Sequence, residues 1–286
     1  DTREVGLEQI VNNGSVIYRA VPSRKWPGEA SLEVGEIWGR KGEWKGNCFL
    51  EEKKVHGITP FLTVPSKVQG KPYRLKANEG KSFQGSIVLG MGFVLTPEEA
   101  QTLIEKDPRN KDILFPYLNG EDLNSRPDQS PSRWVINFHD WPLEKAETYV
   151  DCWKIIEEKV KPERQRKKEN GDYALRKPLP QRYWHYGEKR PALYSSIADI
   201  KQVIVIAATS RTLAFTVSSN KIVFSHATYV FALEDYSDFL ILQSNFHNIW
   251  VHEYASSMKM DLRYTPSDCF ETFPFPSSLS SLDPIG

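Results

Sequence analysis

The stretch VIVIAATSRTLAFTVSSNKIVFSHATYVFAL, residues 203–233, decides the fold class of this chain. β-Branched and aromatic residues dominate it, and short polar segments interrupt it, a pattern typical of consecutive short strands. We predict four strands there, namely Val203–Ala207, Leu213–Val217, Ile222–Ser225 and Tyr229–Leu233.

Helices are predicted on both sides of this stretch. Thr96-Pro97-Glu98-Glu99 has the chemistry of a helix start, with Thr96 as N-cap, proline at the first position and Glu99 completing a capping box. This helix should run to about Lys106. A longer one is predicted between Glu144 and Lys168, interrupted at Pro162. Another should begin at Ser237, with one apolar face made by Phe239, Leu242, Phe246 and Ile249. The fold class is therefore α+β, with a β-rich majority.

The chain divides by composition into two structured parts. Short strands and turns are predicted from Ser15 to about Leu62, and a polar, Gly- and Lys-rich linker follows. We predict a first domain over 1–64, a linker over 65–80, a main domain over 81–276 and a tail over 277–286. The chain begins at Asp1 in what reads as structured sequence, which suggests a piece of a longer protein.

Charge and cysteine usage limit the classes of function. Lysine plus arginine and aspartate plus glutamate both number 37, so a nucleic-acid footprint would have to be local. Cys48, Cys152 and Cys269 form no CxxC pair, which disfavours a zinc site or disulfide framework and fits a reducing, cytoplasmic setting. No stretch approaches the roughly 20 apolar residues of a membrane helix, so no membrane partner is expected.

Catalytic motifs are absent from the sequence. It has no GxGxxG loop for a cofactor, no Asn-Pro-Pro-Tyr motif, no GKS/T phosphate loop and no GxSxG elbow. Glu51-Glu52-Lys53 has the ExK spacing of a nuclease, but no metal-binding aspartate precedes it on a strand. We interpret it as a solvated charge run, and predict no catalytic residue, metal site or cofactor site in this chain.

Two segments carry chemistry suited to DNA. Cations gather after residue 158 and continue among aromatic residues, which can hold phosphates and stack on sugars or bases. The predicted backbone contacts are Lys161, Arg164, Arg166, Lys167, Lys168 and Arg182. A solvated helix end beside ordinary core aromatics explains this composition equally well.

The second segment is Ser256–Tyr264, in which Lys259, Asp261 and Arg263 alternate. On one extended strand all three would project from the same face. Lysine or arginine suits guanine, and aspartate suits the amino group of cytosine, in the major groove. A salt-bridged surface strand is the alternative.

Several phrases, taken in order, resemble the C-terminal part of the type IIG/IIL, MmeI-like restriction–modification enzymes and related adenine-N6 methyltransferases. Residues 1–64 also resemble the last strands of that family's methylase domain, through Ile17-Tyr18-Arg19-Ala20, Trp26 and Glu33–Trp38. The phrases over the main domain are Gly85-Ser86-Ile87 to Gly92-Phe93, Thr96–Ala100, Phe115–Asn124, Ser132–Phe138, Arg263-Tyr264-Thr265 and Phe273–Pro276.

The resemblance implies a target-recognition domain that reads duplex DNA for a methylase domain of the same parent chain. That parent would transfer a methyl group from S-adenosylmethionine to adenine, and its cofactor loop would lie outside this chain. Whether a nuclease is fused to it stays open. The family's base-reading strand corresponds to Lys259, Met260, Asp261 and Arg263, and a preceding element corresponds to His226 and Ala227.

Two alternatives remain from the sequence. One is a protein-interaction scaffold of an antiphage-defence methylase, and the other is a small nuclease with an unrecognised site. Metal-dependent cleavage by the chain alone would favour the nuclease. Tight binding of a protein partner without DNA affinity would favour the scaffold.

Overall fold

The computed structural model describes residues 6–28, 32–65, 72–258 and 261–276, and these form two compact units divided between Lys71 and Pro72. The division lies inside the segment predicted as a linker. The predicted tail lies outside the described residues. In the part of the chain that is described, no helix is long and apolar enough to cross a membrane.

The first unit is a small sheet with one helix. The helix is α2 (Leu7–Asn12), and the strands are β1 (Ser15–Lys25), β2 (Glu33–Lys41), β3 (Cys48–Leu50) and β4 (Lys53–Val55), in the order β2-β1-β3-β4. Strand β1 pairs antiparallel with β2 and parallel with β3. Its core is small, with Ile17, Ala20, Cys48 and Ile58 as the buried apolar members.

Glu51 and Glu52 form the turn between β3 and β4. Both are exposed, and Glu52 pairs with Arg19 at 2.6 Å. Lys53, the first residue of β4, is also exposed, so Glu51-Glu52-Lys53 is a solvated charge run, as interpreted from the sequence.

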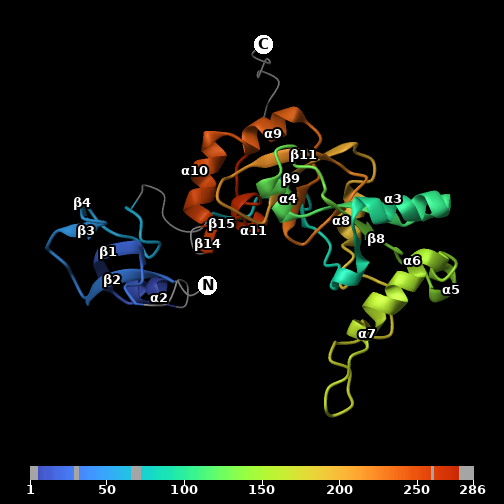
Figure 1. Cartoon of the computed structure of the whole chain (residues 1–286). Coiled ribbons are helices and arrows are strands. Elements are labelled where there is room, and N and C mark those ends of the chain that lie inside the picture. Colours follow the sequence, from blue (N-terminus) through green and yellow to red (C-terminus); the bar gives the residue numbers. More distant parts are fainter. Residues whose placement is uncertain (1–5, 29–31, 66–71, 259–260, 277–286) are drawn as a thin grey trace. The chain divides into compact units, whose positions relative to one another are not determined.

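The second unit contains three small sheets (Figure 1). Its central sheet has the order β11-β9-β13-β5, with β5 (Ser82–Gln84), β9 (Gln202–Ala207), β11 (Phe215–Ser219) and β13 (Thr228–Phe231) all antiparallel. Val203, Val205 and Ala207 pack into one core cluster, and Ile204 and Ile206 into another. Both faces of β9 are therefore buried, which explains its unbroken apolar sequence.

The second sheet has the order β12-β7-β8-β6 and supports a helical layer. It consists of β6 (Val94–Leu95), β7 (Leu114–Leu118), β8 (Arg133–Ile136) and β12 (Val223–Phe224). Around it lie the 3₁₀ turns η2 (Met91–Phe93) and η3 (Pro108–Asp112), with α3 (Pro97–Lys106), α4 (Gly120–Ser125), α5 (Leu143–Ala146) and α6 (Val150–Ile155). The α3 capping box is present, since the Thr96 side chain accepts from Glu99 N at 3.2 Å, so that prediction is confirmed.

The third sheet is short and has the order β10-β15-β14. Its strands are β10 (Thr209–Ser210), β14 (Ser256–Met258) and β15 (Asp261–Arg263). The helices α9 (Tyr236–Leu242), α10 (Asn245–Tyr254) and α11 (Pro266–Cys269) complete this end of the unit. Of the four strands predicted in residues 203–233, all occur with shifted ends, and β10 is an additional one.

Two predicted helices differ from the structure. The helix predicted over 144–168 is broken into α5, α6, a π-helical segment η4 (Ile156–Val160) and α7 (Lys161–Arg164), where Pro162 lies in the first turn of α7. The helix predicted from Ser237 is two helices, α9 with Asp235 at its N-cap and α10 capped by Ser244. Consequently Phe246 and Ile249 are exposed, by 82% and 68%, because α10 buries His247 and Val251 instead.

Candidate nucleic-acid interface

The turn Ser225–Thr228 lies where the three sheets meet. It joins β12 of the second sheet to β13 of the central one, and the Ala227 carbonyl accepts from Ala208 N at 2.8 Å. The Ala208 carbonyl in turn accepts from Tyr264 N at 3.0 Å, directly after β15. Two segments predicted separately as base readers, His226–Ala227 and the strand ending at Arg263, are therefore joined through one backbone residue.

We call this turn, together with β10 and β15, the reading surface. Strand β15 is central in its sheet, with Arg263 opposite Thr209 on β10 and opposite Ser256 on β14. His226 and Arg263 are exposed, and Asp261 is half-exposed. These groups can therefore contact a ligand from solvent. Strand pairing holds the backbone of Asp261 and Arg263, and the Gln84 side chain donates to the His226 carbonyl.

The expectation of one continuous strand over Ser256–Tyr264 is wrong. The segment contains two strands, β14 and β15, which pair antiparallel with Met258 opposite Asp261. Lys259, Asp261 and Arg263 were expected to share one face of a single strand. Because the segment forms two strands, that arrangement does not occur. Lys259 and Met260 lie outside the described residues, so only Asp261 and Arg263 of this predicted set have a structural description.

The backbone of Gly85 lies very close to the turn Ser225–Thr228, which we call the reading turn. Gly85 N donates to the Thr228 carbonyl at 3.1 Å, and a Cβ on Gly85 would meet the Ser225 carbonyl oxygen at 2.1 Å. Any side chain there would displace the turn. On the other side the Asn124 amide at the end of α4 donates to the Thr209 carbonyl at 3.0 Å.

Helix α4 begins next to the same turn. Asn119 accepts from Glu121 N and Asp122 N, while Asp122 accepts from Asn119 N, so these two residues form a capping box at the start of α4. A Cβ on Gly120 would lie 3.0 Å from the Ala227 carbonyl. Asn119 therefore caps α4, and the glycine at position 120 leaves space for the Ala227 carbonyl.

The reading surface includes a cation that the sequence analysis did not single out. Arg211 follows β10, its side chain is 93% exposed, and its guanidinium lies 3.9 Å from the Asp261 carboxylate. This loose ion pair leaves Asp261 able to accept another donor. Arg211 lies near Asp261 because it directly follows β10, a strand of two residues that pairs with β15. A strand this short has no periodic pattern, so the sequence did not reveal this contact.

Tyr264 anchors the end of β15 in the core. It is 1% exposed, and its hydroxyl lies 3.1 Å from Nε2 of His247, which is fully buried. Burial lowers the pKa of His247 to about 4, so this imidazole is neutral at neutral pH. Burial also raises the pKa of Tyr229 on β13, and the Arg263 guanidinium opposes that rise.

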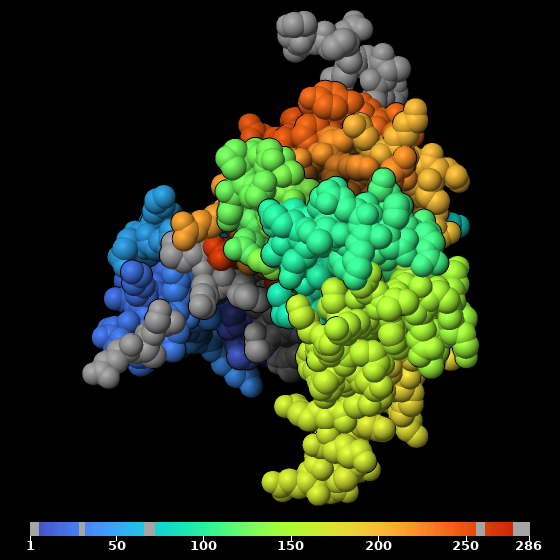
Figure 2. Space-filling model, turned by 45° about the vertical axis from the view of Figure 1, so that its right-hand side comes forward, coloured from blue at the N-terminus to red at the C-terminus, as the bar shows by residue number. Residues whose placement is uncertain are grey.

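The basic arm, residues 165–182, follows α7 and forms a protrusion (Figures 1 and 2). It turns back on itself through Ala174 N to the Arg166 carbonyl and Lys168 N to the Asp172 carbonyl, both at 2.8 Å. Its sequence holds six cations and two carboxylates. Five of the predicted contacts fall on it or beside it, namely Lys161, Arg166, Lys167, Lys168 and Arg182.

Four of these five cations are exposed: Arg166, Lys167, Lys168 and Arg182. Lys167 lies 5.8 Å from the Tyr173 ring centroid. Lys161 is partly occupied, because its Nζ lies 3.0 Å from the Glu157 carboxylate.

Arg164 is a correction to the predicted phosphate contacts. It is completely buried, and its guanidinium donates to the Val88 and Leu89 carbonyls at 2.9 and 2.6 Å. Burial lowers its pKa. Arg164 therefore holds the base of the arm against η2 and its preceding loop, and no phosphate can reach it.

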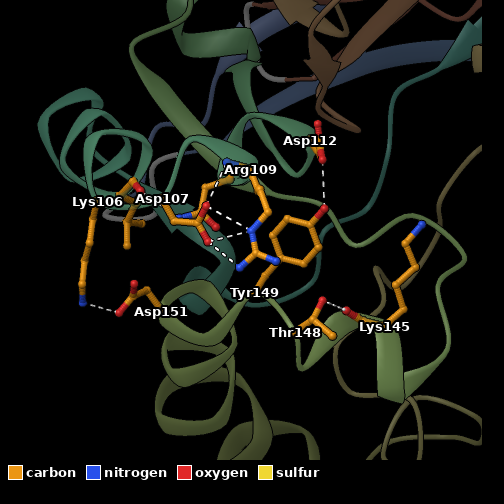
Figure 3. Close-up of polar contacts among 10 residues, drawn as sticks. Lys106, Asp107, Arg109, Asp112, Lys145, Thr148, Tyr149 and Asp151 are labelled. Carbon is orange, nitrogen blue, oxygen red and sulfur yellow. Dashed lines mark hydrogen bonds and ion pairs between the residues drawn. The ribbon is translucent and has the colours of Figure 1, made fainter.

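A second concentration of charge, between α3 and α6, is internally neutralised (Figure 3). Asp107 binds Arg109 at 2.7 Å, Asp151 binds Lys106, and the Tyr149 hydroxyl donates to Asp112 at 2.9 Å. The Arg109 guanidinium also lies 5.7 Å from the Tyr149 ring centroid. This cluster braces the helical layer, and its cations are committed to carboxylates.

Comparison with known proteins identifies the family. Residues 80–277 match the family described as "MmeI, target recognition domain". The chain belongs to the MmeI target recognition domain family. No curated protein matches the chain.

A solved structure shares the fold of this family member. The structure of the type IIL restriction–modification enzyme MmeI in complex with DNA matches with a TM-score of 0.74 at 17% sequence identity. The match covers 96% of this chain and 37% of the MmeI chain, so the chain spans little more than a third of that enzyme. At this identity the likeness establishes the α+β fold, and it extends the shared architecture beyond the matched recognition domain.

Proposed function

We propose that this chain is the sequence-specific DNA recognition module of a restriction–modification adenine-N6 methyltransferase. The observation that carries the proposal is the junction of the His226–Ala227 turn with β15 through Ala208, within a domain of the MmeI target recognition family. Both segments present exposed polar side chains from rigid backbone. Such preorganised groups are what reading of base edges needs.

The two surfaces would divide the work of binding. Asp261, Arg263 and His226 would contact base edges from the reading surface, together with Lys259, Met260 and Ala227. Lys161, Arg166, Lys167, Lys168 and Arg182 would contact phosphates. Base contacts carry sequence information, whereas phosphate contacts supply salt-dependent affinity.

The remainder of the methyltransferase would belong to a longer parent chain. Residues 1–64 would be the end of its methylase domain, and the S-adenosylmethionine site would lie in another part of that parent. The sequence of this chain has neither the glycine-rich loop nor the Asn-Pro-Pro-Tyr motif that this chemistry uses.

Selection from a randomised duplex library tests the proposal. The 286-residue chain, at low salt, should enrich a short defined sequence. Asp261→Ala should relax the preference at one position of that sequence, because a good side-chain contact to a base edge contributes about 1–3 kcal/mol of discrimination. Asp199→Ala removes another exposed aspartate, outside the reading surface, and is a matched control that should leave the enriched sequence unchanged. Absence of any enriched sequence would contradict the proposal.

The two alternatives make different predictions in the same preparation. A nuclease would cleave DNA in the presence of a divalent cation, whereas the described residues bring no three histidine, cysteine or acidic side chains together as metal ligands. A scaffold would bind a protein and no DNA. The groove of about 890 Å³ beside Phe246 and Ile249 is where such binding would be sought first.

A further inference from the structure

A cleft of about 690 Å³ lies at the foot of the basic arm. It is lined by the end of the arm, the segment from His185 to Leu193 and β5. Its charged lining residues are the cations Arg176, Lys177, Arg182, Lys189 and Arg190 and the carboxylates Asp140 and Glu188. Cations exceed carboxylates, so the cleft favours an anion.

The two carboxylates of the cleft pair mainly with Lys189 and Arg190 and leave its other cations largely unneutralised. Asp140 binds Lys189, and Glu188 lies 3.3 Å from Arg190. Arg176 lies 3.6 Å from Glu188 with its side chain 80% exposed, a loose contact. Lys177 and Arg182 are exposed, and neither forms an ion pair within the described part of the chain. Lys177 and Arg182, together with the loosely paired Arg176, are therefore available to an anion.

The inner wall of the cleft is connected to the reading turn. The Arg190 guanidinium donates to Oε1 of Gln84 at 3.1 Å, and Nε2 of Gln84 donates to the His226 carbonyl at 2.8 Å. Gln84 and Arg190 both line the cleft. Two hydrogen bonds thus separate an anion site from a residue predicted to read bases.

Arg190 is held in a strained conformation. Its φ is 57°, in the left-handed region that costs a non-glycine residue free energy, and Pro191 follows it at the start of α8 (Pro191–Ser196). Paired backbone bonds between Ile87 and Glu188, both 3.0 Å, hold the preceding residues in place. Strain that is maintained this way points to a positional requirement for the guanidinium.

We propose that this cleft binds a phosphodiester of the DNA duplex, and that Arg190 and Gln84 are positioning residues that set the reading turn relative to it. The inference rests on the proposed function and names a site within it. Arginine offers a planar, bidentate match to phosphate, and phosphate contacts fix the register of a protein on DNA. The hydrogen bonds of Gln84 to Arg190 and to the His226 carbonyl then position the turn that contacts the bases relative to the bound phosphate.

The salt dependence of duplex binding tests the cleft. Each phosphate contact contributes a slope of about 0.9 in log K against log salt. Lys177→Ala combined with Arg182→Ala should therefore lower the slope by about 2, so that between 50 and 200 mM salt the wild-type affinity falls roughly tenfold more than that of the variant. Lys111→Ala, an exposed cation elsewhere, is the control and should leave the slope unchanged.

The outcomes separate this site from the general function. If wild-type chain selects a DNA sequence and the double variant keeps the wild-type slope, the cleft proposal is wrong and the proposed function stands. If wild-type chain selects nothing, both fail. Inorganic phosphate at constant ionic strength should displace duplex poorly; displacement at low millimolar concentration would assign the cleft to free phosphate and overturn the proposal.

Gln84→Glu tests the connection. A glutamate keeps the acceptor for Arg190 and removes the donor to the His226 carbonyl. We expect relaxed preference at the position read by the turn, together with weaker binding of every duplex because a carboxylate now lines the cleft. An unchanged sequence preference overturns the positioning role, and so does an equal loss at every position accompanied by a lower melting temperature.

Discussion

The reading surface and the basic arm differ in how their side chains are held. The reading surface lies on strands and a turn that are tied together by backbone bonds through Ala208, and a buried tyrosine, Tyr264, follows directly at its end. The arm is a protruding loop whose cations are exposed and whose backbone bonds are local turns and a single bridge, with no strand pairing to the sheets in the described part of the chain. Base reading needs fixed geometry, whereas attraction to phosphates needs only charge at the right distance.

Arg164 lies where the basic arm joins the folded core. In the sequence it stands beside the cations of the arm, yet its side chain is buried in the core. We predict that Arg164→Ala lowers the free energy of unfolding by about 3 kcal/mol, because it opens a cavity and leaves the Val88 and Leu89 carbonyls unpaired.

Urea denaturation measures this change. Arg166→Ala, two residues along and exposed, is the matched control and should leave unfolding almost unchanged. Equal stability of the two variants would show that buried Arg164 contributes no more to folding than an exposed cation of the arm, which would contradict this prediction.

Acid should destabilise the core that holds Tyr264, directly after β15. The pKa of His247 is about 4 in the folded chain and about 6.5 when unfolded, so the unfolded state takes up the proton first and the stability contributed by neutral His247 is lost as pH falls from 6.5 towards 4. Between pH 7 and pH 5 the wild-type chain should lose about 2 kcal/mol more than His247→Gln.

Chemical denaturation at the two pH values gives this difference. His247→Gln keeps a polar group near the Tyr264 hydroxyl without titrating in this range. The same pH dependence in both proteins would show that His247 is already solvated in the folded chain.

The smallest expected effect concerns Arg211. Its ion pair with Asp261 is long and exposed, and such pairs contribute almost nothing to stability. Arg211→Ala should therefore change the melting temperature by less than about 2 °C. Its effect should appear instead in the selected DNA sequence, through Asp261. A large fall in melting temperature would show that this pair stabilises the fold.

Local chemistry made much of the fold predictable. The capping boxes at Thr96 and Asn119 and the apolar run at 203–207 are each determined by neighbouring residues. The ends of helices were less predictable where tertiary contacts decide. Residues 156–160 form a π-helical segment, and α10 turns Phe246 and Ile249 outward because His247 and Val251 fill the core.

The candidate site was predicted from two kinds of signal. The alternation of charge in the sequence singled out Asp261 and Arg263, and the resemblance to a known family added His226, but no sequence signal showed that Ala208 joins their segments. The burial of Arg164 could not be inferred among its neighbouring cations. Gln84 and Arg211 were missed because their roles depend on contacts with His226 and Asp261, which lie far from them in the sequence.

One paired measurement tests the division of labour most directly. His226→Ala with Asp261→Ala on the reading surface is compared with Arg166→Ala, Lys167→Ala and Lys168→Ala on the arm, by duplex selection and by the salt slope of binding. We predict that the first variant loses base preference and keeps its slope. The second should keep its preference and lose a slope of about 2 to 3. If both variants change both quantities alike, the two surfaces are not separate in function, which contradicts the division of labour.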